Sequence, residues 1–162
     1  MKRQKGFSLI ELLIVVAIIL IIAAIAIPNL LRARMSASEA SAVGSIRTID
    51  TAEIEYNSTY GQGYSPDLQS LGSGGTSPCA ATAAHACLID DALATASTAA
   101  KPKTGYYFTY TPGTGNTSYS VVGLPAVVGQ TGQRGFYSDQ TGVIRFTPDA
   151  NTPPNSTSAP LQ

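Results

Sequence analysis

The chain has 162 residues, ten of them basic and ten acidic, so its formal net charge is zero. Charged residues make up only 12% of the sequence, about half the share that is usual in globular domains. The length is sufficient for one modest domain plus an appendage. These totals exclude the strongly basic class of nucleic-acid-binding proteins, and no nucleic-acid motif is visible.

The apolar residues are concentrated near the N-terminus. Residues 12–27 form an uninterrupted apolar run, which extends back to Phe7 with only Ser8 and Glu11 as polar breaks. As a helix rising about 1.5 Å per residue, this run spans roughly 31 Å, the thickness of a bilayer core. Because Lys2, Arg3 and Lys5 precede it, we expect a single membrane-spanning segment with a cytoplasmic N-terminus.

The helical pattern continues beyond the apolar run. Apolar residues recur every three or four positions, as on one face of a helix: Val43, Ile46, Ile49, Ala52, Tyr56 and Tyr60. Arg47, Asp50 and Glu53 are expected to lie off this stripe. We therefore predict one nearly continuous helix from about Ser8 to Tyr60, bent at Pro28 and stopped by the glycines after Tyr60. Such a helix would be roughly 80 Å long, so its first half must be covered by lipid or by other copies.

The remaining sequence predicts a small β-rich domain. A Gly/Ser/Thr/Ala-rich loop region, with a short helix at residues 90–100, precedes four strands expected at residues 106–111, 118–122, 134–138 and 143–147. The last two strands flank the turn-like residues 139–142 and predict a hairpin. The fold class is therefore α+β, with a long N-terminal helix packed on a small antiparallel sheet.

The segment GFSLIELLIVV, Gly6 to Val16, resembles the processing and assembly motif of type IV pilins and type II secretion pseudopilins. The resemblance extends through the first thirty or so helical residues, including Pro28. It implies that prepilin peptidase cuts after Gly6 and methylates the new N-terminus at Phe7. It also implies that Glu11 guides assembly of a filament.

Elementary electrostatics supports a special role for Glu11. A carboxylate within an apolar membrane span is costly and calls for a partner or a function. Cleavage after Gly6 removes the leader's basic residues, which leaves the new α-amine of Phe7, on a neighbouring copy, as the obvious cation. An ordinary membrane anchor, or a secretory signal cut near Ala24-Ile25-Ala26, is the alternative. Neither alternative requires an acid at position 11 or a helix that continues past the membrane.

The other chemically notable residues are few. Cys79 and Cys87 are expected to form a structural disulfide, with zinc binding together with His85 as the weaker alternative. Asp139 and Asp149 are weak calcium candidates that are better explained as turn residues. No catalytic constellation, phosphate loop or metal cluster is visible in the sequence, so we expect neither an enzyme nor a bound metal or other cofactor.

The sequence is thus divided into five segments: a leader at residues 1–6, a membrane or filament-core half-helix at 7–28, an amphipathic half-helix at 29–61, a globular head at 62–147 and a flexible tail at 148–162.

We expect a pilin-like subunit that forms a homo-oligomeric filament for adhesion, motility or DNA uptake. Its expected partners are prepilin peptidase, membrane lipid and an inner-membrane assembly platform. It would lie in the inner membrane before assembly and in an extracellular or periplasmic filament afterwards. A type II secretion pseudopilin and a membrane-anchored binding module are the alternatives.

Overall fold

The computed structural model describes residues 8–161 and divides the chain into two compact units, residues 1–34 and 35–162. Helix α1, Leu9–Tyr60, begins in the first unit and ends in the second. The predicted helix from about Ser8 to Tyr60 is confirmed almost to the residue. Gly61 follows with a positive φ of 63°, a left-handed conformation that glycine adopts without steric cost and that commonly terminates helices.

In the first unit, the large apolar side chains of α1 have no cover. Their exposed fractions range from 45% at Leu31 to 80% at Leu9. This stretch is long and apolar enough to cross a membrane, and none of its most apolar window is buried. The helix continues through Pro28 without interruption, although proline supplies no N–H for the backbone ladder. The bend expected at this residue stays a prediction.

The second unit contains a five-stranded antiparallel sheet in which each strand pairs with the next in sequence. The strands are β1 Tyr106–Pro112, β2 Tyr119–Pro125, β3 Gly135–Asp139, β4 Arg145–Thr147 and β5 Ala159–Pro160. In β2 every second residue, from Tyr119 to Pro125, is buried, as expected for a strand with one face on a core. The α+β class and the β3–β4 hairpin are confirmed, with one strand more than the sequence predicts.

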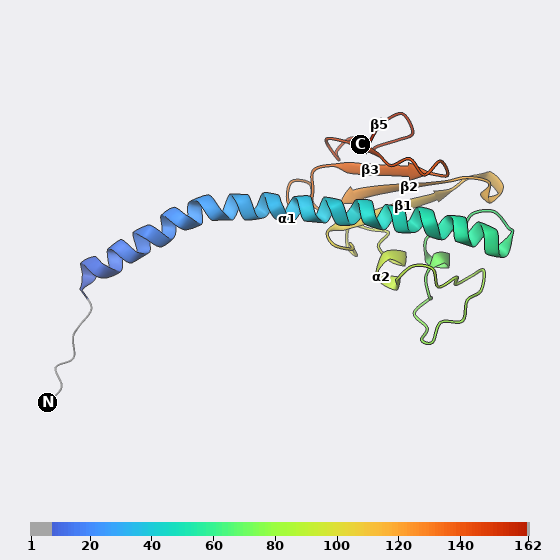
Figure 1. Cartoon of the computed structure of the whole chain (residues 1–162), viewed down its shortest axis with the longest axis horizontal. Helices are drawn as coiled ribbons and strands as arrows, with labels where there is room; N and C mark the ends of the chain where they lie inside the picture. The colour runs from blue at the N-terminus through green and yellow to red at the C-terminus, as the bar shows by residue number, and fades with distance from the viewer. Residues whose placement is uncertain (1–7, 162) are drawn as a thin grey trace. The chain divides into compact units, whose positions relative to one another are not determined.

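The second half of α1 packs on this sheet (Figure 1). Ile46 and Ile49 of the predicted stripe are fully buried and belong to the same core cluster as Phe108 and Phe136 of the sheet. Gly123 lies where helix and sheet approach closely, because a Cβ there would sit 3.1 Å from the Phe108 ring and 3.3 Å from the Ile46 side chain. The stripe therefore anchors the head domain to the helix, as the sequence predicts.

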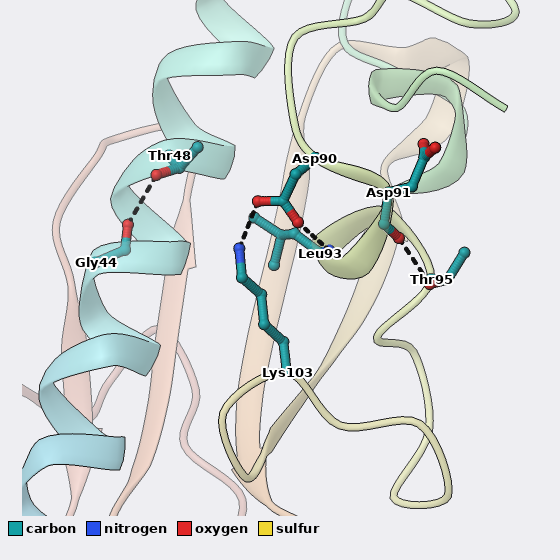
Figure 2. Close-up of polar contacts among 7 residues, drawn as sticks. All are labelled: Gly44, Thr48, Asp90, Asp91, Leu93, Thr95 and Lys103. Atoms are coloured by element: carbon teal, nitrogen blue, oxygen red, sulfur yellow. Dashed lines mark hydrogen bonds and ion pairs between the residues drawn. The ribbon is translucent and has the colours of Figure 1, made fainter. Parts of the chain in front are cut away.

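Helix α2, Asp91–Ala94, is much shorter than the helix expected over residues 90–100. Asp90 caps it by accepting the Leu93 N–H at 2.8 Å, and Lys103 donates to the other Asp90 oxygen at 2.6 Å (Figure 2). The helix cannot continue because the carbonyl of Ala96 accepts the N–H of Phe108 in β1. A long-range contact with the sheet thus overrides the local helix propensity. Residues 8–161 also contain two short 3₁₀ helices, η1 Gln69–Leu71 and η2 Thr114–Asn116.

The C-terminal tail contributes to the sheet. The composition of residues 148–162 predicts a flexible tail, whereas Ala159 and Pro160 pair with β4 as strand β5. The Leu161 N–H donates to the Ile144 carbonyl at 2.8 Å, and the Leu161 side chain packs on the core. Strand pairing and the packing of Leu161 therefore fix a segment that its Pro/Ser/Thr composition alone does not predict to be ordered.

Replacing Ile49 by alanine is expected to lower the free energy of unfolding by about 2–4 kcal/mol, because it removes a fully buried side chain and leaves a cavity. Ile54→Ala is the matched control on the same helix: Ile54 is 66% exposed, so its loss should cost less than about 0.5 kcal/mol. Urea unfolding of a fragment covering residues 35–162, followed by circular dichroism, measures both. Equal effects at the two positions would contradict the burial of Ile49.

Candidate functional site

The residues expected to direct processing and assembly lie at the start of α1. Gly6 and Phe7 lie outside the described residues. Glu11 is in the first helical turn, where its Oε2 accepts the backbone N–H of Ser8 at 2.9 Å. Ser8 and Glu11 have the spacing of a capping box, in which the third helical residue satisfies the backbone donor of the cap residue.

This hydrogen bond directs the Glu11 carboxylate back toward the N-terminal end of the helix. Free N–H groups and the helix dipole favour a negative charge there. Since Phe7 directly precedes Ser8, cleavage after Gly6 would create the new amine one residue from the N–H that Glu11 accepts. The sequence predicts the importance of the charge at Glu11 but not this capping contact, for which the Ser-x-x-Glu spacing is the signal.

A second group of acidic side chains lies on α1 within the second unit. Glu39, Asp50 and Glu53 are all buried and all bonded to the rest of the head; we name them the helix-to-sheet carboxylates. Glu39 accepts hydrogen bonds from the backbone of Gln133 and from the backbone and side chain of Arg134, with an ion-pair distance of 2.8 Å. It therefore ties α1 to the segment that enters β3.

Asp50 and Glu53 make similar contacts one turn apart. Asp50 accepts the hydroxyls of Tyr119 and Ser138, at 2.9 and 2.8 Å. Glu53 is fully buried and accepts both the N–H and the hydroxyl of Ser65. Burial raises the pKa of Asp50, although the hydrogen bonds from Ser138 and Tyr119 act in the opposite direction. Burial likewise raises the pKa of Glu53, against the hydrogen bonds from Ser65.

The expectation that Asp50 and Glu53 lie off the helix stripe is wrong. Asp50 follows Ile46 by four residues and Glu53 follows Ile49 by four, so both share the buried side of the helix. Their acidity suggested exposure, but hydroxyl partners on the sheet and the following loop satisfy them. These partners lie between 12 and 88 residues away in sequence, which is why periodicity alone did not find them.

Cys79 and Cys87 are joined by a disulfide. The loop that they close meets the end of α1, where the Tyr56 hydroxyl donates to the Ala83 carbonyl at 2.8 Å. His85 in this loop is exposed. Because the two cysteines are bonded to each other, they are not thiolate ligands for zinc. The disulfide is therefore a structural clip, as the sequence predicts.

The two weak calcium candidates occupy turns. Asp139 accepts the N–H of Thr141 at 2.9 Å, and Asp149 accepts the N–H of Asn151 at 3.0 Å. Both contacts are side-chain turns in which aspartate bonds the backbone two residues ahead. Within residues 8–161, no three His, Cys, Asp or Glu side chains gather as a metal site.

Comparison with known proteins bears on the N-terminal segment. The family model described as "Prokaryotic N-terminal methylation motif" matches residues 1–27. The chain is 64% identical over 39 residues to the type IV wide pilus major component PilA4 of Thermus thermophilus, 24% of this chain and 30% of that protein. It is 45% identical over 54 residues to the type IV major pilin protein PilA of Myxococcus xanthus, 33% of this chain and 24% of that protein.

A fimbrial protein of Pseudomonas aeruginosa is 79% identical over 29 residues, 18% of this chain and 19% of that protein. The N-terminal segment is similar to that of these type IV pilins and fimbrial proteins. The chain spans less than a third of the length of these relatives, and no solved structure matches it. The likeness therefore lies in the pilin-type N-terminus, and the head domain is described by its own structure.

Stability of the head should depend on pH through Asp50. The unfolded carboxyl ionises near its ordinary pKa of 3.8, whereas the folded one ionises at a higher pH. As pH rises between these two values, the unfolded state loses its proton first, so wild-type stability falls relative to Asp50→Asn. Thermal unfolding of both proteins from pH 3 to 8 measures this difference. A difference in melting temperature that is constant across this range would contradict the raised pKa.

Proposed function

We propose that the chain is the precursor of a type IV pilin-like structural subunit. Prepilin peptidase cuts it after Gly6 and methylates Phe7, and the mature subunit polymerises through the apolar half of α1. The observation that carries this proposal is the methylation motif at residues 1–27 on a helix whose large apolar side chains from Leu9 to Leu31 are all exposed. Either feature alone also fits an ordinary membrane anchor, but their combination is typical of a polymerising subunit.

In this proposal, the exposed apolar surface is covered in turn by two different environments. Before assembly, lipid covers the side chains from Leu9 to Leu31 in a single inner-membrane span, with the N-terminus in the cytoplasm. After assembly, the same segments of other copies cover them in a filament outside that membrane. An inner-membrane assembly platform transfers the subunit from one environment to the other. Burial of this much apolar surface, at about 25 cal/mol per Å², supplies the main driving force in both states.

Glu11 gives this nonspecific surface a defined register. In the lone subunit, its carboxylate accepts only the Ser8 N–H among the hydrogen bonds of residues 8–161. The methylated amine of Phe7 on a neighbouring copy offers a charged donor. Buried ion pairs contribute little net stability but can specify register. The pair would therefore align neighbouring helices in a filament whose apolar contacts alone allow sliding.

Among the alternatives, the names of the relatives favour a pilin over a pseudopilin, since all of them are pilus or fimbrial proteins. A filament for adhesion, motility or DNA uptake is therefore the proposed role. Electron microscopy of fibres sheared from the cell surface, with peptide identification, distinguishes a pilin from a pseudopilin. Absence from such fibres, together with a protein-secretion defect on deletion, would favour the pseudopilin.

Processing is tested by mass spectrometry of the mature protein. The expected N-terminal peptide begins with N-methyl-phenylalanine at position 7, because the peptidase removes residues 1–6 and methylates the new amine. Gly6→Val is the control, since a bulkier residue at the cleavage position should leave the leader attached. A mature wild-type chain that begins at Met1 or after Ala26 would refute the proposal.

Glu11→Ala is expected to leave membrane insertion and leader cleavage largely intact but to reduce sheared fibre yield severely. The substitution removes the charge that aligns the Phe7 amine while it retains the apolar surface. Asp149→Asn, an exposed acid in a head-domain turn, is the matched control and should assemble normally. Immunoblots of the membrane and sheared fractions measure both steps. Normal fibre yield from Glu11→Ala would contradict the proposed role of Glu11 in aligning neighbouring subunits.

A further inference from the structure

One exposed side of α1 in the second unit carries opposite charges that have no ion-pair partner among residues 8–161. We name it the Arg47–Glu55 face, and it consists of Gly44, Arg47, Thr48, Thr51, Ile54 and Glu55, all exposed. The spacings of three and four residues place these positions on the same side of the helix. This side is distinct from the buried stripe that holds the sheet.

Arg47 and Glu55 are the charged ends of this face. Among the described residues the ion pairs are Lys103–Asp90 and Arg134–Glu39, and neither side chain of the face takes part in them or in a hydrogen bond. Eight residues separate the two, or about 12 Å along the helix, which is beyond the reach of a pair within one helix. The fold therefore presents a positive and a negative group along one side of the helix and pairs neither of them with another described residue.

The surface between the two charges is hollowed and suited to contact. A groove of about 280 Å³ is lined by Arg47, Thr48, Thr51, Ala52, Glu55 and Leu88. The Thr48 hydroxyl donates to the Gly44 carbonyl at 3.0 Å (Figure 2), and Thr51 bonds the Arg47 carbonyl in the same way. Since their hydroxyls are engaged by their own helix, these threonines demand no outside hydrogen-bond partner.

Two further residues of the face are not explained by the packing of the chain itself. Ile54 is a large apolar side chain that is 66% exposed. Gly44 lies inside the helix although a Cβ there would meet nothing within 4 Å, so the fold of the subunit does not require a glycine. Glycine within a helix is unfavourable but permits another backbone to approach closely. Both residues fit a surface that another chain covers.

We propose that the Arg47–Glu55 face is a contact between neighbouring subunits of the filament, in which Arg47 of one copy pairs with Glu55 of the next. The inference rests on the proposed function, because it requires parallel copies. Charge complementarity selects a second copy as the occupant: copies in parallel and staggered by eight residues, about 12 Å, bring the two opposite charges level.

The proposed pairing at Glu11 requires a stagger in the same direction. There the amine of residue 7 on one copy meets the carboxylate of residue 11 on the other, an offset of four residues, or about 6 Å. In both pairs, the copy displaced toward the carboxyl end of the helix supplies the cation. Both pairs therefore require a stagger in the same direction, and the long arginine side chain can make up part of the difference between the two offsets.

Charge exchange in cells that assemble the full chain tests this contact. The variants are Arg47→Glu, Glu55→Arg and the double exchange, with Lys101→Glu as the control because Lys101 is exposed and lies outside the face. Each single reversal places like charges opposite each other at every repeat, so sheared fibre yield should fall several-fold. The double exchange should restore most of the yield, and the control should match wild type. Fibres of the restored variant and of wild type should both loosen in high salt, which screens exposed ion pairs.

The outcomes distinguish this inference from the proposed function. Membrane level and leader cleavage should be normal in all variants, because the face lies outside the processed segment. Wild-type yield from both single variants, or no recovery in the double exchange, would overturn the Arg47–Glu55 pairing while leaving the filament proposal intact. Absence of fibres from the wild-type chain, despite correct processing, would overturn both.

Discussion

The uncovered apolar side chains of α1 are the constraint on which the rest of this protein depends. Between Leu9 and Leu31, every large apolar residue is at least 45% exposed, and the part of this unit that the structure describes, residues 8–34, contains no second helix or strand that could cover it. The hydrophobic effect makes this surface unfavourable in water. In our proposal, lipid and then other copies of the chain cover this surface, and the remaining features of the chain determine how specific those contacts are.

Charge supplies the specificity that apolar surface lacks. In the first unit, Glu11 is bonded at the helix start, where the helix dipole favours a carboxylate. In the second unit, Glu39, Asp50 and Glu53 are buried and hydrogen-bonded to the head domain. The first position serves contacts between chains in our proposal, whereas the other three fix the helix within its own chain. The carboxylates of α1 thus serve two purposes. Those buried by the chain's own fold hold the helix to the head domain, whereas Glu11 serves contacts between chains in our proposal.

The sequence was most informative where the physics is local. The run up to Ile27 and the stripe from Val43 to Tyr60 predicted one helix, and the β3–β4 hairpin followed from its turn residues. Contacts made over long sequence separations were missed. Asp50 meets Ser138, 88 residues away, and the Ala96 carbonyl is taken by β1, which ends α2 early. The order in the tail arises in the same way, from strand β5 and Leu161.

The helix-to-sheet carboxylates also have a mechanical consequence. Glu39 and Glu53 are fourteen residues apart, so these attachments are distributed over about 21 Å of helix. Tension applied along α1 would act on all three carboxylates together with the buried stripe between them. Shearing such a row requires many bonds to yield at once, whereas peeling would break them one by one. The head domain would therefore resist separation from α1 under a much larger force than a single hydrogen bond could withstand.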